Sequence, residues 1–318
     1  MKILEKIDKI PGGIILTPML CTAIINTVCP QALLVGGVTT KLFSTYGTQV
    51  FIGALLFLAG SQLSVKDVPG ALKRGGVLLL GKVLIAVVLT MIYLRLFEAE
   101  GILGIPVLAF CITVISLNPG TFLAVASAHG DSIDPPGFGL YNLVVVPTVP
   151  ALILGVLDGA AFDYMGIVTT MVPFLLGMLL GNLDPDLKKL FGGAIRPMLF
   201  FAGCNFGAAV DLLAAVRTGL SGIALSLIYI LFCALGLLLV DKLVLRQPGY
   251  AAASLSCVAG ASVSMPAIVG EILPQYAPYA QTATAQIACA VVITTVFSCF
   301  FTKWVLHRYG EAPGRKDL

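Results

Sequence analysis

The chain has 318 residues, of which 58% are hydrophobic and 11% charged, and its formal net charge is +3. Soluble domains usually carry about 25% charged residues, so this composition excludes a soluble single-core protein. Lipid must surround much of the surface. The small net charge gives no sign of a nucleic-acid partner.

Ten apolar segments of roughly membrane length follow one another, and a helix needs ~20 apolar residues to cross ~30 Å of hydrocarbon. The fold class predicted is therefore an all-α polytopic membrane protein with ten transmembrane helices. The segments are 14–29, 47–63, 76–96, 103–128, 138–157, 165–181, 195–210, 219–240, 250–272 and 282–302. The stretch before the first, MKILEKIDKIPGG, mixes acids and bases without a small-residue cleavage site. It is predicted to be an interfacial helix rather than a cleaved signal.

Basic residues predict the orientation. Most of the 19 lysines and arginines fall on the side that holds the N-terminus, and only Lys41, Arg95 and Arg217 fall on the other. Because cytoplasmic loops are enriched in basic residues, both termini are predicted to be cytoplasmic. Lys82 falls inside the third helix, where it either extends to the cytoplasmic interface or pairs, with Asp241 as a candidate.

The second half of the chain is similar in sequence to the first half. Residues 56–63, LFLAGSQL, align with residues 199–206, LFFAGCNF, so that Gln62 meets Asn205, and Pro18 likewise meets Pro173. The halves 1–158 and 159–318 would each hold five helices. Because five is odd, they would enter the membrane in opposite senses, which is the inverted repeat typical of secondary transporters. The alternative is chance similarity between two apolar sequences.

The fourth segment is interrupted by Asn118-Pro119-Gly120. The residue before a proline avoids the α conformation, asparagine is a good N-cap, and proline is favoured at the first helical position. Asn118 is therefore predicted to cap a half-helix that begins inside the membrane, where its free N–H groups suit an anion. Gly120 admits a close approach to the backbone, and Ser116 and Thr121 add hydroxyls.

The ninth segment has a matching feature, because Ser262 and Ser264 precede Pro266, the counterpart of Pro119. Two breaks at corresponding positions of two halves indicate a transporter's binding site. Taken singly, each is also explained as a proline kink.

Three further polar residues are candidates. Gln62 and Asn205 lie at membrane depth, although joining helices is the alternative role for such amides. Glu271 lies within the ninth segment and is predicted to carry the coupling ion, unless that helix ends early and Glu271 faces water. The predicted substrate ligands are thus Asn118, Gly120, Thr121, Ser116, Ser262, Ser264, Gln62 and Asn205.

A secondary transporter is the leading class, and an intramembrane enzyme is the rival. The sequence has no phosphate-binding Gly-x-x-x-x-Gly-Lys-[Ser/Thr] loop. Its paired acids, Asp184 and Asp186, fall in a cytoplasmic loop, and Ser262 has no evident base. No cofactor and no metal site is predicted. The predicted partners are a small anionic solute, a proton or sodium, and membrane lipid.

Several motifs resemble bacterial 2-keto-3-deoxygluconate permeases. They are IPGGIILTP at 10–18, AIINT at 23–27, GGVT at 36–39, LNPGT at 117–121 and FTKW at 301–304, so the resemblance covers essentially the whole chain. It implies proton-coupled uptake (symport) of 2-keto-3-deoxygluconate or a similar sugar acid across the bacterial inner membrane. Sodium-coupled symport of an organic anion is the alternative.

The resemblance also implies kinship with the bile acid sodium symporter fold. In that fold helices one, two, six and seven form a gate domain, and helices three to five and eight to ten form a core. Helices four and nine of the core unwind and cross, which here would involve residues 116–121 and 262–266. Residues 262–265 show no clear match to that fold's sodium site, so a proton is the predicted coupling ion. The core is expected to rock against the gate.

Overall fold

The computed structural model describes residues 2–7, 13–65, 68–131, 134, 137–142, 144–159, 164–208 and 211–312. Regular structure in these ranges is helical, apart from one isolated bridge between Ile102 and Ile105. In chain order the elements are α1 (Ile3–Ile7), α2 (Gly13–Val28), η1 (Pro30–Ala32), α3 (Gly37–Leu42), α4 (Thr45–Gln62), α5 (Val68–Phe97), α6 (Val107–Ile115), α7 (Pro119–His129), α8 (Gly137–Asn142), α9 (Thr148–Leu157), α10 (Tyr164–Leu183), α11 (Pro185–Ala208), α12 (Leu212–Arg217), α13 (Leu220–Ile228), η2 (Tyr229–Ala234), α14 (Leu235–Leu239), η3 (Val240–Val244), α15 (Tyr250–Leu255), η4 (Gly260–Ser264), α16 (Met265–Ile272), η5 (Pro274–Tyr279) and α17 (Ala280–Tyr309).

Each predicted apolar segment contains helix. By length and composition, four stretches of the described chain are long and apolar enough to cross a membrane: Leu72–Phe97, Leu220–Val244, Tyr250–Ile272 and Pro274–Tyr309. The fourth and ninth segments are interrupted, as predicted. The fifth is also interrupted, between α8 and α9, which was not predicted. Pro147 explains that break, because it disfavours helix at the residue before it and stands directly in front of α9.

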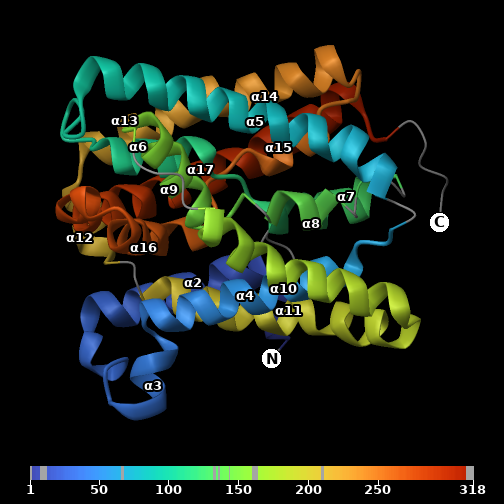
Figure 1. Ribbon diagram of the computed structural model, residues 1–318, viewed down its shortest axis with the longest axis horizontal. Coiled ribbons are helices and arrows are strands. Elements are labelled where there is room, and N and C mark those ends of the chain that lie inside the picture. The colour runs from blue at the N-terminus through green and yellow to red at the C-terminus, as the bar shows by residue number, and fades with distance from the viewer. Residues whose placement is uncertain are drawn as a thin grey trace.

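Four helices, α2, α4, α10 and α11, pack side by side and form the lower layer of Figure 1. We call this layer the panel. The backbones of neighbouring panel helices are in contact. A Cβ added at Gly177 of α10 would lie 1.9 Å from the carbonyl oxygen of Phe57 in α4. A Cβ at Gly60 of α4 would lie 2.0 Å from the carbonyl oxygen of Phe174 in α10. Glycine thus permits these helices to pack closely, as small residues do between membrane helices.

The second layer holds α5 to α9 and α13 to α17 (Figure 1). Every residue of α6 and of α15 is buried, because both half-helices are enclosed by the longer helices around them. Large apolar side chains cover the outside of the layer: Leu80 of α5 is 70% exposed and Leu220 of α13 is 85% exposed. This apolar exterior is the surface that lipid requires.

Candidate functional site at a helix crossing

The two interrupted helices meet at their breaks. The Asn118 N–H donates to the carbonyl oxygen of Leu255, at 3.2 Å. Thr121 Oγ1 donates to the carbonyl oxygen of Ser254, at 2.6 Å. Asn118 and Thr121 therefore bind the last turn of α15, and the start of α7 is joined to the end of α15.

A second set of bonds completes the crossing. The hydroxyls of Ser116 and Ser262 hydrogen-bond at 2.8 Å, and the Ala259 N–H donates to Ser116 Oγ at 2.9 Å. The Tyr229 hydroxyl donates to the Ser116 carbonyl oxygen at 3.1 Å. Ser116 is the residue on which the fourth, eighth and ninth helices converge.

Asn118 caps α7, as the sequence predicts. Its backbone is extended, with φ −115° and ψ 94°, and its Oδ1 accepts from the Thr121 N–H at 3.2 Å. Pro119 follows at the first helical position. The cap leaves the Gly120 N–H as a donor at the positive end of the half-helix.

The ninth helix breaks earlier than expected. The predicted crossing segment was 262–266, but α15 already ends at Leu255, and the residues from Ser256 to Ala259 are not helical. Pro266 lies in the first turn of α16, where a proline is tolerated. It therefore follows the break rather than causing it. Of the segment 262–266, Ser262 makes the side-chain bond to the fourth helix.

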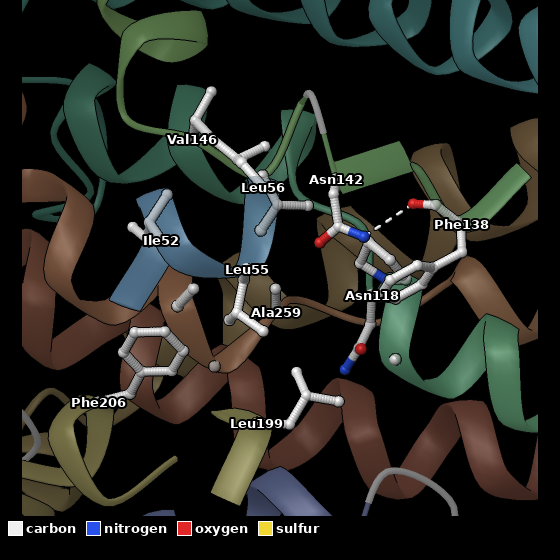
Figure 2. A pocket seen from close by; sticks show the side chains of 15 residues that line it. Ile52, Leu55, Leu56, Asn118, Phe138, Asn142, Val146, Leu199, Phe206 and Ala259 are labelled. Carbon is white, nitrogen blue, oxygen red and sulfur yellow. Dashed lines mark hydrogen bonds between the residues drawn. The ribbon is translucent and has the colours of Figure 1, made fainter. Parts of the chain in front are cut away.

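A pocket lies between the panel and the crossing (Figure 2). Apolar side chains of α4 and α11 form one wall, and the breaks of the fourth and ninth helices form the other. Figure 2 shows the Asn118 amide turned toward Leu199 of α11. The lining residues are Ile52, Leu55, Leu56, Asn118, Pro119, Gly120, Phe138, Asn142, Val145, Val146, Leu199, Phe206, Ala259, Gly260 and Ala261.

The polar groups of this pocket come mainly from two helix starts. Gly120 stands at the start of α7, while Gly260 and Ala261 begin η4, which continues into α16. The first N–H groups of a helix have no partner within it and carry partial positive charge. Two amide side chains, those of Asn118 and Asn142, add to them. The arrangement suits a small anion with hydroxyl groups.

Asn142 was not selected from the sequence. Its Nδ2 donates to the Phe138 carbonyl oxygen at 2.7 Å, which holds the amide at the pocket wall (Figure 2). The signal available in the sequence was a lone amide beside the Val146-Pro147 break.

The predicted ligands are distributed unevenly. Asn118 and Gly120 line the pocket. Ser116, Thr121 and Ser262 lie behind it, buried, and hold the crossing together. The hydrogen bonds of these three side chains fix the position of the backbone at the two breaks. Ser264 is buried too, and its hydroxyl has no hydrogen-bond partner in the part of the chain that the structure describes.

Gln62 and Asn205 lie between panel helices, outside the pocket. Gln62 Nε2 donates to the Lys188 carbonyl oxygen at 2.9 Å, near the start of α11. Asn205 Nδ2 donates to the Leu42 and Ser44 carbonyl oxygens, at 2.6 and 3.2 Å, at the start of α4. In this structure both amides join helices.

Glu271 is exposed and stands one residue before the end of α16. It does not line the pocket.

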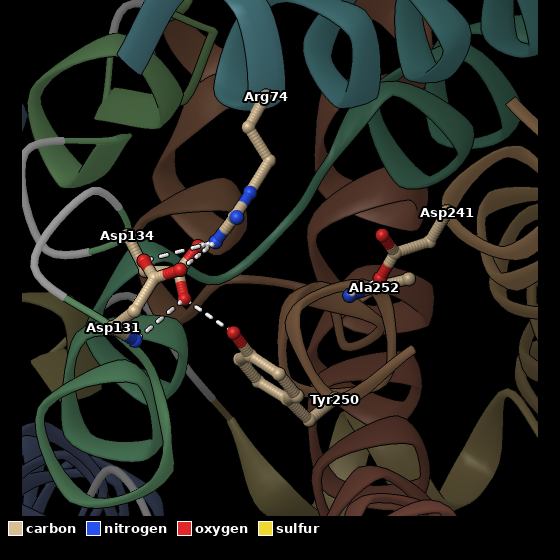
Figure 3. A network of polar contacts seen from close by, with 6 residues as sticks. All are labelled: Arg74, Asp131, Asp134, Asp241, Tyr250 and Ala252. Carbon is tan, nitrogen blue, oxygen red and sulfur yellow. Dashed lines mark hydrogen bonds and ion pairs between the residues drawn. The ribbon is translucent and has the colours of Figure 1, made fainter. Parts of the chain in front are cut away.

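A largely buried ionic network lies at the other end of the crossing helices (Figure 3). Arg74 Nη1 lies 2.9 Å from Asp131 Oδ2 and 2.8 Å from Asp134 Oδ1. The Tyr250 hydroxyl donates to Asp134 Oδ2. We call these four residues the Arg74 network. It ties the start of α5 and the start of α15 to the segment that follows α7.

Asp241 lies beside this network and is fully buried. Its Oδ2 accepts from the Ala252 N–H of α15 at 3.2 Å (Figure 3). Its Oδ1 has no hydrogen-bond partner among the described residues. Neither Asp241 nor the Arg74 network lines the pocket.

A family model described as 2-keto-3-deoxygluconate permease matches residues 4–311. The chain belongs to the 2-keto-3-deoxygluconate permease family. As a member of this permease family it is a transport protein and not an enzyme. With its long apolar helices, it is a bacterial integral membrane protein.

Curated relatives named 2-keto-3-deoxygluconate permease cover almost the full chain. The one from Enterobacter sp. (strain 638) is 32% identical over 319 residues, which is 98% of this chain and 96% of the relative. The one from Pectobacterium atrosepticum is 34% identical over 91% of this chain and 92% of the relative. The one from Bacillus subtilis is 31% identical over 96% of this chain and 94% of the relative.

Proposed function

We propose that this permease is a secondary active transporter that takes up 2-keto-3-deoxygluconate, or a similar sugar acid, together with a proton. It would act by alternating access across the inner membrane, with both termini cytoplasmic. The observation that carries the proposal is the pocket between the panel and the crossing, where two helix starts face the same space. The family's name supplies the substrate class.

In this proposal the carboxylate of the sugar acid binds the free N–H groups at Gly120 and Gly260. The amides of Asn118 and Asn142 accept hydrogen bonds from the hydroxyls of the sugar acid and donate hydrogen bonds to them. Ser116, Thr121 and Ser262 position these groups by holding the two breaks together. The apolar wall of α4 and α11 excludes water on the opposite side, which strengthens the polar interactions.

For the motion, the panel is proposed as the gate and the second layer as the core, in two inverted halves, 1–158 and 159–318. Equivalent contacts support the repeat. Gln62 binds near the start of α11, and its counterpart Asn205 binds the start of α4. Each helix pair also has a close glycine contact: a Cβ at Gly60 would approach the Phe174 carbonyl, and one at Gly207, one turn beyond the residue aligned with Gly60, would approach the carbonyl of Met19. Phe174 and Met19 each follow one of the aligned prolines of the two halves.

The anion site is tested by Asn118→Asp. The aspartate keeps an N-cap acceptor for the Thr121 N–H but places a negative charge beside the proposed carboxylate site. Two charges at about 4 Å repel by roughly 1–4 kcal/mol, depending on the local dielectric. Sugar-acid affinity, measured with the purified protein by ligand-dependent thermal shift, is expected to fall by at least about fivefold.

Asn118→Ser is the matched control, because serine caps a helix about as well and adds no charge. Asn118→Ser should bind the sugar acid more tightly than Asn118→Asp does, although the two variants should have the same melting temperature. Equal affinity of the two variants would show that the anion does not bind at the start of α7.

The coupling ion is tested in proteoliposomes. Uphill uptake of the labelled sugar acid is expected under a pH gradient and is expected to be unaffected by replacing sodium with choline. Uptake driven by a sodium gradient at equal pH would instead establish sodium coupling. Glu271 is the sequence's candidate for the coupling group, and Glu271→Gln belongs in the same assay.

A further inference from the structure

Lys82 is an ionisable residue buried in a helix long and apolar enough to cross the membrane. It is 1% exposed, although its neighbours on α5, Leu80 and Leu84, are 70% and 65% exposed. Its side chain therefore points away from lipid, into the second layer. It neither reaches the interface nor pairs with Asp241, and no carboxylate lies within ion-pair distance in the described chain. An isolated charge at such depth is costly and is a functional candidate by default.

The surroundings of the Lys82 ammonium connect it to the crossing. Its Nζ lies 4.3 Å from the centroid of the Tyr229 ring, at cation–π distance. The Tyr229 hydroxyl donates to the Ser116 carbonyl oxygen, and the Cys233 thiol donates to that of Val114, at 3.5 Å. Both acceptors belong to the C-terminal end of α6, which carries partial negative charge. The ammonium thus lies on the negative side of the break, while the positive start of α7 faces the pocket.

A continuous buried chain leads from Lys82 to the pocket. Tyr229 contacts Ser116, and Ser116 Oγ accepts from the N–H of Ala259. Ala259 lines the pocket next to Asn118. Buried residues therefore fill the space between Lys82 and the site of the proposed anion, and two charges interact strongly across such a low-dielectric region.

We propose that Lys82 carries the coupling proton: it is charged while an anion occupies the pocket and neutral when the pocket is empty. This inference rests on the proposed function. The proton passes from outside water to Nζ as the anion binds, and it leaves from Nζ to the cytoplasm after the anion departs. No covalent bond changes, and the sugar acid remains an anion throughout.

The physical reason is charge compensation. With no carboxylate beside it, the protonated lysine is stable only when a negative charge is near, and the substrate carboxylate supplies that charge. The loaded form (anion with ammonium) and the empty form (neutral lysine) both carry no net charge at the crossing. Both forms can therefore move the core through the membrane, whereas a loaded form with neutral lysine cannot do so easily.

The neighbouring titratable groups leave Lys82 free for this role. Asp241 of η3 binds the Ala252 N–H, and Arg74 on α5 itself is paired within its own network. The remaining groups around the ammonium are a phenol and two thiols, which are neutral at ordinary pH: Tyr229 and Cys233 of η2, and Cys257 from the segment after α15.

Two substitutions separate the two protonation states. Lys82→Arg stays charged, since arginine is not deprotonated in proteins, and Lys82→Met stays neutral. In proteoliposomes Lys82→Arg is expected to exchange labelled for unlabelled sugar acid but to lose uphill, pH-driven uptake. Lys82→Met is expected to bind at least about tenfold more weakly, with an affinity that no longer depends on pH. Lys189→Met, at an exposed lysine of α11, should behave as the parent protein.

The unsubstituted protein provides a test that needs no variant. One anion and one proton move together, so uptake at equal pH should not change when a membrane potential is imposed with potassium and valinomycin. Affinity for the anion should fall as pH rises, because binding requires the protonated lysine. Uptake that changes severalfold with the potential would overturn the assignment.

The outcomes distinguish this inference from the proposed function. If no sugar acid binds or enters, the proposed function fails. If the parent protein accumulates the sugar acid and Lys82→Arg still accumulates it uphill, the assignment to Lys82 alone fails. Loss of uphill uptake in Glu271→Gln together with its retention in Lys82→Arg would transfer the coupling role to Glu271.

Discussion

Arg74→Met is expected to destabilise the protein by about 3–5 kcal/mol, the cost of removing one partner from a buried ion pair. The Asp134 side chain is 2% exposed and accepts from Arg74, from the Tyr250 hydroxyl and from the Asp131 N–H, of which only Arg74 carries a charge. Without Arg74 a carboxylate is left buried without a counterion. The start of α5 loses its bond to the segment that follows α7 at the same time, and Asp134, which binds Tyr250 of α15, is held less firmly.

The measurement is the melting temperature of the detergent-purified protein, followed by sugar-acid uptake in proteoliposomes. Lys73→Met is the matched control, because Lys73 is the exposed neighbour of Arg74 on α5 and surface substitutions usually cost within about 0.5 kcal/mol. Tyr250→Phe removes only the hydroxyl bond to Asp134 and should fall between the two. Equal melting of Arg74→Met and Lys73→Met would contradict a stabilising role for the network.

Gly177→Ala is expected to cost about 3 kcal/mol, at the upper end of overpacking effects. The new Cβ would lie 1.9 Å from the backbone oxygen of Phe57. Backbone cannot rotate away as a side chain can, so α10 and α4 must move apart along their contact. The panel loses the close approach that glycine permits, and alternating access should slow if the panel is the gate.

Gly193→Ala in α11 is the control, because a Cβ there meets nothing within 4 Å. Alanine at a helical glycine should stabilise by roughly 0.5–1 kcal/mol, so the two substitutions are expected to shift the melting temperature in opposite directions. A neutral result for Gly177→Ala would mean that the panel helices are farther apart in solution.

Features that depend on local sequence were predictable. The apolar segments, the Asn118 cap and the interruption of the fourth and ninth helices follow from composition, backbone restrictions at proline and capping chemistry. The position of the second break was not predictable, because Pro266 is as compatible with the first turn of a helix as with its interruption.

Side-chain roles at membrane depth were harder to predict. Gln62 and Asn205 lie in apolar surroundings like Asn142, yet the first two join panel helices and the third lines the pocket. An amide side chain hydrogen-bonds whichever unsatisfied polar group lies near it, and the orientation of its helix about the helix axis decides which group that is. That orientation is set by packing against neighbouring helices, which single-sequence patterns do not contain.

By itself the sequence determined the membrane class, the succession of helical segments and the half-helix that starts at Pro119, since these depend on hydrophobicity and on backbone restrictions between adjacent residues. Only the tertiary structure decided which groups surround the pocket and that Lys82 lies beneath the crossing without an acidic partner. Those properties arise from contacts between α5, η2 and the two breaks, which are far apart in the chain and meet only when the helices pack.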